Sequence, residues 1–159
     1  MPRITQSVSE LKRFIENAES VWVEVFYSAD TNKVIIVDGR EYLRLPLRFS
    51  TRAKVIAYFR RYWGIALSNR MFCNLMTVTR NGRLYVIAGD TGPLPYYPRR
   101  LRVTSRTPTR LRVTANLSFD VDTDEGTEII RYLIARSGER LTILDRSNKF
   151  GDPRYQPCR

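Results

Sequence analysis

The residue type that says most about possible chemistry is one that the chain lacks. Its 159 residues include no histidine and two cysteines. Without imidazole, Ser-His-Asp and Cys-His nucleophilic sites cannot be assembled within the chain, and the usual ligands of catalytic zinc and non-haem iron are missing. Two cysteines are too few for a structural zinc site or an iron–sulfur cluster. We therefore expect no enzyme activity, no metal and no cofactor, although carboxylate-based or lysine-based chemistry stays open.

A short acidic segment offers a first candidate site. Its carboxylates belong to Asp120, Asp122, Asp124 and Glu125. The Asp-x-Asp-x-Asp spacing resembles the start of a calcium-binding EF-hand loop. However, Gly126 comes one place too late, and Arg131 occupies the twelfth position, where a bidentate glutamate is needed. The segment is therefore interpreted either as a partner-binding acidic surface or as a solubilising turn, since Asp and Gly favour turns.

Arginine dominates the charge and supplies a second candidate. The 27 basic and 16 acidic residues give a formal net charge of +11, which favours anionic partners. Four arginines alternate with apolar residues in two neighbouring segments, at Arg100, Arg102, Arg110 and Arg112. They could bind phosphates or an anionic wall polymer, or they could form cross-strand ion pairs and a solvated surface. No aromatic residue is interleaved with them, as a site for single-stranded nucleic acid would require.

A loop rich in glycine and proline, residues 89–98, carries a tyrosine pair, Tyr96 and Tyr97. Exposed tyrosines often contact protein partners, and a rigid connection packed on the core is the competing interpretation. The glycines form no phosphate-binding motif, because no Lys-Ser/Thr pair follows them. Asp90, in the same loop, has no catalytic companion nearby in the sequence.

The two cysteines, Cys73 and Cys158, lie 85 positions apart and form one disulfide or none. Cys73 falls in an apolar helical segment, where a free buried cysteine is common. A bridge would instead indicate an oxidising compartment.

The elements that position these residues begin with a helix. Ser7 and Glu10 have the spacing of a capping box. Apolar residues then recur every three or four positions, at Val8, Leu11, Ile15, Ala18, Trp22 and Val25. This stripe predicts a helix that packs on a sheet or on another helix, and Glu19 lies off the stripe. The helix end stays open, because residues 21–27 (VWVEVFY) suit a strand equally well.

Two dipeptides, Asp38-Gly39 and Asn81-Gly82, predict β-hairpins. Between the hairpins, apolar periodicity predicts a helix over 51–63, which Ser50 caps, and a short helix over 66–75. Three aromatic residues at helical spacing are assigned to the core: Trp22, Phe59 and Trp63.

The remaining chain alternates apolar and polar residues and is predicted to form antiparallel strands, with one arginine-rich face. Segregated helices and strands favour an α+β fold, in which an N-terminal helix and two further helices pack on one face of a curved antiparallel sheet. The length suits a single domain over 1–145, followed by an irregular C-terminal tail over 146–159.

Three stretches resemble one family of proteins from Gram-positive bacteria. They are residues 38–64 (DGREYLRLPLRFSTRAKVIAYFRRYWG), residues 81–92 (NGRLYVIAGDTG) and a final hairpin ending near Leu144-Asp145. In that family, an extended segment with an aromatic residue precedes a Thr-led helix with a Tyr-Leu or Tyr-Phe pair. In element order and in these motifs, the chain is similar to the IseA-type inhibitors of cell-wall DL-endopeptidases over most of its length.

The resemblance implies a compact α+β domain of cystatin-like or NTF2-like outline. It also implies a secreted, non-catalytic protein that blocks papain-like cysteine peptidases of the cell wall with an acidic surface. In this chain that surface corresponds to the segment from Asp120 to Glu125. The chain departs from such inhibitors in its strongly basic charge.

Two functions are therefore carried forward. The first is a non-catalytic module of the bacterial cell envelope that inhibits or regulates peptidoglycan DL-endopeptidases. The alternative is a basic module that binds a polyanion, either nucleic acid or an anionic wall polymer; a small-ligand pocket is a third. We expect a monomer without a membrane span, because no apolar run reaches about 20 residues. The location is extracellular or at the envelope if a signal peptide is removed, and cytoplasmic otherwise.

Overall fold

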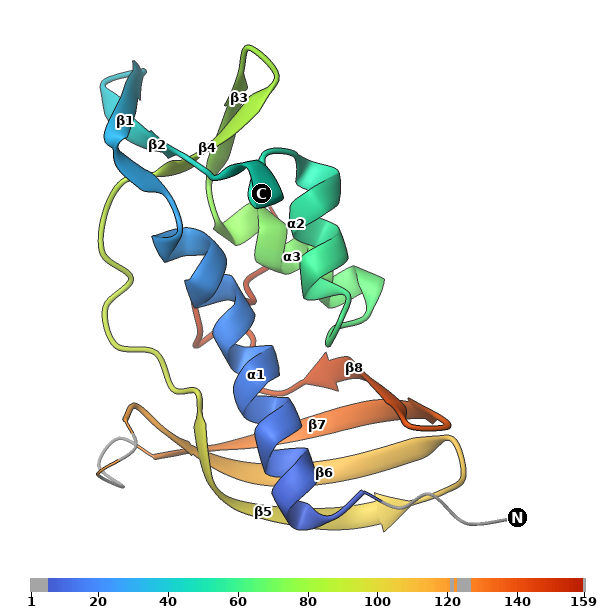
Figure 1. Ribbon diagram of the computed structural model, residues 1–159. Helices are drawn as coiled ribbons and strands as arrows, with labels where there is room; N and C mark the ends of the chain where they lie inside the picture. The colour runs from blue at the N-terminus through green and yellow to red at the C-terminus, as the bar shows by residue number, and fades with distance from the viewer. Residues whose placement is uncertain (1–5, 121, 123–126, 159) are drawn as a thin grey trace.

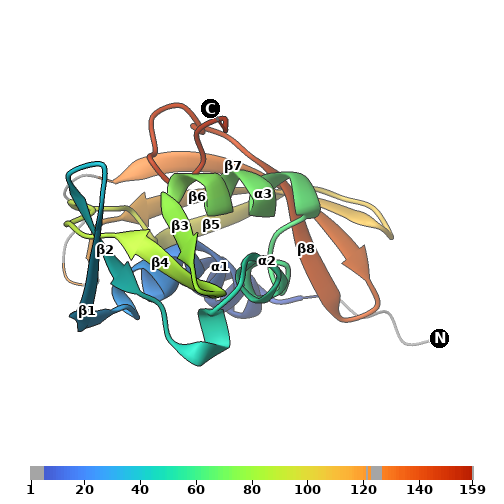
Figure 2. The ribbon, with the colours of Figure 1, turned by 90° about the horizontal axis from the view of Figure 1, so that it is seen from above.

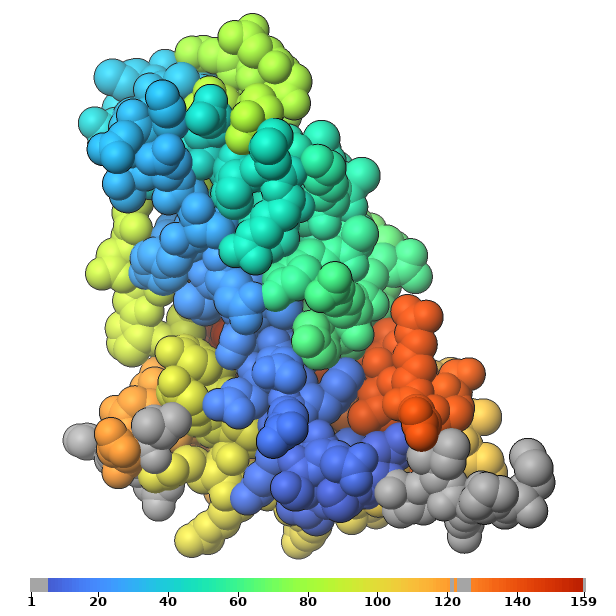
Figure 3. All heavy atoms as spheres, in the orientation of Figure 1, coloured from blue at the N-terminus to red at the C-terminus, as the bar shows by residue number. Residues whose placement is uncertain are grey.

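The computed structural model describes residues 6–120, 122 and 127–158. In this part of the chain three α-helices and eight β-strands form an α+β fold, which confirms the predicted class (Figure 1). The strands belong to two four-stranded antiparallel sheets. The long helix α1 (Val8–Tyr27) runs from one sheet to the other, and the space-filling view shows the molecule widest at the second sheet (Figure 3).

Helix α1 begins with the predicted capping box. The Ser7 side chain accepts a hydrogen bond from the Glu10 N–H, and the Glu10 carboxylate accepts one from the Ser7 N–H. The stripe is buried from Leu11 to Val25, which confirms its packing role, although Val8 at its start is half exposed. The helix continues to Tyr27, so the segment that also suited a strand is helical.

The first sheet is built from the two predicted hairpins. Its strands are β1 (Asp30–Val37), β2 (Arg40–Arg44), β3 (Thr77–Arg80) and β4 (Arg83–Ile87), in the order β1-β2-β4-β3. At both turns the first residue has a positive φ, 51° at Asp38 and 52° at Asn81, and a glycine follows. This backbone suits a two-residue hairpin turn.

Two short helices lie between the hairpins. A 3₁₀ turn (Leu47–Phe49) leads into α2 (Arg52–Phe59), and α3 (Ile65–Asn74) follows. The N-cap of α2 is Thr51, whose side chain accepts from the Lys54 N–H, and not Ser50 as predicted. Helix α2 also ends four residues earlier than predicted.

The segment after α2 reaches the second sheet. Trp63 forms an isolated parallel bridge with Ile143, and the Gly64 N–H donates to the Ile143 carbonyl at 2.8 Å. The indole N–H of Trp63 donates to the Ala18 carbonyl of α1 at 2.8 Å. Trp22, Phe59 and Trp63 are all buried, as predicted.

The second sheet follows the chain order, β5-β6-β7-β8. Its strands are β5 (Tyr97–Arg106), β6 (Arg110–Ser118), β7 (Glu128–Ser137) and β8 (Arg140–Arg146). Alternate residues of β6, from Leu111 to Leu117, are buried. Helix α1 lies across β5 on this apolar face (Figures 1 and 2), and the Lys12 ammonium donates to the Arg99 carbonyl at 3.1 Å.

The division into two sheets differs from the single sheet expected. The pairing of β2 with β4 joins both hairpins into the first sheet. The extended connection over 88–96 then runs down one side of the molecule (Figure 1). It contains Pro93 and Pro95, which lack the N–H that a ladder needs, so the next strand begins a new sheet.

The described chain after β8, residues 147–158, has no helix or strand, but it is packed against the protein. Asp152, Arg154 and Tyr155 are buried. A disulfide joins Cys73 of α3 to Cys158, and the Asn74 amide donates to the carbonyls of Arg154 and Gln156. The sequence left undecided whether these cysteines pair, and the structure shows that they do. In the described residues, no helix has the length and apolarity that crossing a membrane requires.

Candidate functional site

The tyrosine pair lies where the loop over 89–98 enters the second sheet. The two ring centroids are 4.5 Å apart, and both side chains are partly exposed. The Tyr96 N–H donates to the Ser118 carbonyl at 3.2 Å, and Tyr97 pairs with Ser118 in the sheet register. The pair is therefore held at the end of β6, where the acidic segment begins.

The acidic segment starts with a local turn. The Ser118 hydroxyl donates to the Asp120 carbonyl at 2.6 Å, and the Asp122 N–H donates to the Asp120 carboxylate at 2.8 Å. This contact is typical of an aspartate that stabilises its own turn. Asp124 and Glu125, which were predicted to belong to the same surface, lie outside the described residues.

Electrostatics show that these two candidates are neighbours. The pKa of the Tyr97 phenol is raised by its hydrogen bond with Tyr96, then by partial burial, and further by the negative charges of Glu16 and Asp120. The structure thus brings together two groups that the sequence analysis treated separately. We call Tyr96, Tyr97, Asp120 and Asp122 the tyrosine–aspartate corner.

The loop that carries the tyrosines is anchored at both ends. The Tyr27 hydroxyl donates to the Asp90 carboxylate at 2.8 Å and accepts from the Thr91 N–H at 3.1 Å. The Tyr27 hydrogen bond is the main reason that the pKa of Asp90 lies below its ordinary value. Further along, the Arg154 guanidinium donates to the Pro95 carbonyl at 3.0 Å. Asp90 is therefore part of a loop anchor.

The four predicted arginines occupy one face of the second sheet. Arg100, Arg102, Arg110 and Arg112 are exposed on the side of the sheet opposite to α1, while the residues between them point inward. Arg131 of β7 joins them, because its position pairs with Thr114 and Thr114 pairs with Arg102. We call these five residues the arginine face.

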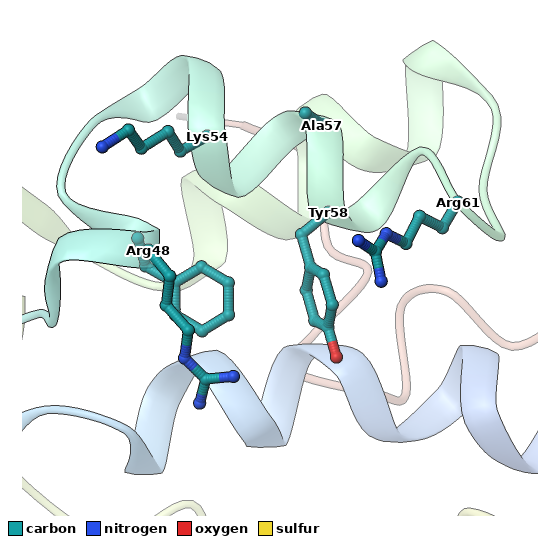
Figure 4. A pocket seen from close by; sticks show the side chains of 6 residues that line it. Arg48, Lys54, Ala57, Tyr58 and Arg61 are labelled. Carbon is teal, nitrogen blue, oxygen red and sulfur yellow. The ribbon is translucent and has the colours of Figure 1, made fainter.

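A hollow of about 360 Å³ beside α2 was not predicted from the sequence. It is lined by Arg48, Phe49, Lys54, Ala57, Tyr58 and Arg61 (Figure 4). The Arg48 guanidinium lies 4.6 Å from the Phe49 ring centroid, and that of Arg61 lies 5.3 Å from the Tyr58 centroid. The polar groups of this hollow therefore already serve contacts within the chain.

Tyr58 is the clearest case of a residue lining the hollow whose polar group already has a partner within the chain. Its hydroxyl donates to the Glu24 carboxylate of α1, and burial followed by this hydrogen bond raises the pKa of Tyr58 to about 12. The Lys54 ammonium donates to the Leu47 carbonyl and the Ser50 hydroxyl. We assign the hollow to the packing of α2 on α1 and not to ligand binding.

The strongest electrostatic cluster is buried and was missed by the sequence analysis. Glu19, which was predicted to lie off the apolar stripe, is fully buried. Its carboxylate accepts from the hydroxyls of Tyr132 and Tyr155 at 2.5 Å each and from the Arg146 guanidinium at 2.8 Å. These partners lie on β7, on β8 and in the C-terminal tail.

The same cluster holds a second carboxylate and a second guanidinium. Arg154 bonds the Asp152 carboxylate at 2.7 Å and the Glu19 main-chain carbonyl at 2.6 Å. The two guanidinium carbons lie 4.3 Å (Arg146) and 5.0 Å (Arg154) from the centroid of the Tyr155 ring. With two carboxylates, two guanidiniums and no solvent exposure, the cluster joins α1, the second sheet and the tail. We assign it a structural role.

The buried tyrosines predict alkaline sensitivity. Desolvation raises the pKa of Tyr132 and of Tyr155 well above the ordinary value of 10.0. Above pH 10 the unfolded chain therefore releases phenolic protons that the folded chain retains, and stability must fall as pH rises. Each tyrosine contributes about 1.4 kcal/mol per pH unit, which chemical denaturation between pH 9 and 11.5 will measure.

Two phenylalanine variants test the assignment. Tyr132→Phe removes one of the retained phenolic protons, so it should reduce the slope of stability against pH by about 1.4 kcal/mol per unit. Tyr155→Phe removes the phenol of the other buried tyrosine and should reduce the slope by a similar amount. A Tyr132→Phe slope equal to that of the natural protein would contradict the role given to this phenol.

No group of three or more histidine, cysteine, aspartate or glutamate side chains is arranged for metal binding within residues 6–120, 122 and 127–158. The carboxylates that do meet, those of Glu19 and Asp152, are neutralised by arginines. What the described surface offers is the tyrosine–aspartate corner and the arginine face.

Comparison with known protein families identifies a match. Residues 4–126 match the model of a protein family described as IseA DL-endopeptidase inhibitor. The matched residues include all three helices, the first sheet, β5, β6 and the described part of the tyrosine–aspartate corner. Strands β7 and β8 and the tail follow the matched region. No curated protein matched the chain.

Proposed function

The chain belongs to the family of IseA DL-endopeptidase inhibitors, and from this premise we propose that it is itself a non-catalytic inhibitor of a peptidoglycan DL-endopeptidase. The observation that carries the proposal is the match over residues 4–126, more than three quarters of the 159 residues. The absence of histidine from the sequence supports a non-catalytic role, since it excludes the Ser-His-Asp and Cys-His sites.

We propose that the tyrosine–aspartate corner enters the active-site cleft of the peptidase. The target is a cysteine peptidase, whose catalytic imidazolium carries a positive charge that the carboxylates of Asp120 and Asp122 can approach. Tyr96 and Tyr97 add two large, partly exposed rings beside them. Tyrosine is enriched at the energetic centres of protein interfaces.

The anchoring of the loop supports this choice of surface. The Tyr27–Asp90 contact and the Arg154–Pro95 contact hold residues 89–98 near both ends of the loop. A loop that is already ordered loses little conformational entropy when it binds. The corner can therefore dock without the ordering cost that a free loop would incur.

The disulfide supports a location outside the cytoplasm. Cys73 and Cys158 are both exposed and bonded to each other, and disulfides persist in oxidising compartments. A location at the cell envelope also places the protein where peptidoglycan hydrolases act. The test is the distribution of the protein between the cytoplasm, cell wall and culture medium.

Inhibition assays with purified DL-endopeptidase test the corner directly. Tyr96→Ala with Tyr97→Ala should raise the inhibition constant at least 100-fold, because two buried tyrosine contacts of about 2 kcal/mol each are lost. Asp120→Asn with Asp122→Asn should raise it about 10-fold to 100-fold, because the charge attraction is lost while the side-chain shape is kept.

A matched control removes two negative charges elsewhere. Glu41→Gln with Glu139→Gln changes exposed residues of the β1–β2 and β7–β8 hairpins and should leave inhibition unchanged. If the natural protein neither inhibits nor binds the peptidase, the proposed function is wrong. If both corner variants inhibit like the natural protein, the function stands and the corner is the wrong surface.

A further inference from the structure

The arginine face is one continuous row of cations on the open side of the second sheet. Arg100 and Arg102 lie two residues apart on β5, and Arg110 and Arg112 lie two residues apart on β6, so neighbours in each pair are about 7 Å apart along the strand. Arg131 of β7 completes the row beside Thr114. Three adjacent strands thus present positive charge in the same direction.

The surface between these side chains is grooved. Three shallow hollows of about 340, 200 and 350 Å³ lie on this face. The first two share Arg131 and Thr114, and the second and third share Arg112 and Leu133. They therefore form one furrow, which runs from the Arg100 end of the sheet to the Arg110 end, roughly 20 Å along β6.

Within the part of the chain that the structure describes, one carboxylate lines the furrow, that of Asp145, and it is paired with Lys149. Among the described residues, no carboxylate forms an ion pair with any arginine of the face; the described ion pairs involve Arg146, Arg154 and Lys149. The side chains between the arginines include the short polar residues Thr104, Thr114 and Asn116, together with the apolar residues Ile129, Leu133 and Leu144. Such a surface favours a ligand that carries repeated negative charges.

The furrow offers no ring on which a nucleic-acid base could stack. The one aromatic residue that borders it, Tyr132, is 2% exposed, and its hydroxyl is bonded to Glu19 on the inner side of the sheet. Binding of single-stranded nucleic acid normally combines backbone contacts with aromatic stacking. Arginine alone pairs well with phosphate, because its planar fork donates two parallel hydrogen bonds.

We propose that the arginine face binds a flexible phosphodiester polymer without bases, of the poly(glycerol phosphate) type. The furrow spans several repeat units, and each arginine can contact one phosphate. This site is separate from the tyrosine–aspartate corner, so the protein can hold the polymer and a peptidase through different surfaces. Binding the polymer would concentrate the inhibitor wherever that polymer is displayed.

Fluorescence anisotropy with labelled poly(glycerol phosphate) tests the proposal on the full chain. With five phosphate contacts, affinity should fall roughly 100-fold between 50 and 200 mM salt. The variant Arg102→Gln, Arg112→Gln, Arg131→Gln should retain about two contacts. Its affinity should fall only roughly sevenfold over the same range, and it should bind at least tenfold more weakly at 50 mM salt.

The matched control, Arg40→Gln, Arg60→Gln, Arg80→Gln, removes the same charge from exposed positions of the first sheet and the C-cap of α2. It should keep the salt dependence of the natural protein. Equal weakening in both variants would show diffuse attraction and overturn the site. A (dT)20 oligonucleotide that binds tenfold more tightly than the polymer would assign the face to nucleic acid and overturn the choice of ligand.

A chemical-modification experiment on the natural protein tests the same site without using variants, so its result does not depend on whether the variants fold. Phenylglyoxal modifies accessible arginines, and mass spectrometry locates the modified sites. Saturating poly(glycerol phosphate) should protect Arg100, Arg102, Arg110, Arg112 and Arg131 and leave Arg40, Arg60 and Arg80 reactive. Uniform protection, or none, would contradict the proposal.

Discussion

Replacing Glu19 with alanine is expected to lower the free energy of unfolding by about 3–5 kcal/mol. The carboxylate is fully buried and is bonded to two guanidiniums and two phenols. Its removal leaves the buried Arg146 and Arg154 with Asp152 as their remaining carboxylate partner. An uncompensated buried charge costs far more than the ion pair contributed, so the loss should exceed that of an ordinary surface substitution.

Urea denaturation at pH 7 will measure this loss. The control is Glu16→Ala, which changes the same residue type three positions earlier on α1, where the side chain is only partly buried; it should cost less than about 1 kcal/mol. A Glu19→Ala loss as small as that of the control would show that the cluster is not the joint between α1, the second sheet and the tail.

Removing the disulfide is expected to have the next largest effect. Cys73 and Cys158 close a loop with a sequence separation of 85. In the chain-entropy model such a loop is worth about 4–5 kcal/mol, and measured values are typically 2–4 kcal/mol. We therefore expect Cys73→Ala with Cys158→Ala to lower the free energy of unfolding by about 2–4 kcal/mol.

Reduction of the natural protein gives an independent measure of the same quantity. Both cysteines are exposed, so dithiothreitol should reach the bond, and the reduced protein should match the double alanine variant. The variant itself should be insensitive to the reductant, which serves as the control. If reduction leaves the stability of the natural protein unchanged, the bridge either is not formed in solution or does not constrain the unfolded chain.

Local sequence patterns were sufficient to predict the buried side of α1, the two hairpins and the exposed face of β5 and β6. The apolar spacing from Leu11 to Val25 predicted the buried side of α1, because a helix repeats every 3.6 residues. Asp38-Gly39 and Asn81-Gly82 predicted the two hairpins of the first sheet, because the turn needs residues that accept a positive φ. The alternation in β5 and β6 predicted that the four arginines share one face.

Contacts between distant residues could not be predicted in the same way. Glu19 lies off the apolar stripe of its helix, and its partners lie 113 to 136 residues away in the sequence. No local pattern therefore indicates that its side chain is buried. Arg131 was missed as a member of the arginine face because its neighbour on the same side of β7, Ile129, is apolar and 60% exposed. Whether the two cysteines form a disulfide could not be decided from the sequence, because a sequence does not give the distance between two residues in space.

The buried cluster also sets an order of events during synthesis. Tyr155 bonds Glu19 across 136 residues, and a ribosome adds about 5–20 residues per second. The helix that bears Glu19 therefore waits roughly 7–27 s before its last partner exists. Until then α1 would have to bury a charge without its counter-ions, so the nascent chain should not close around this helix before its C-terminal segment has been made.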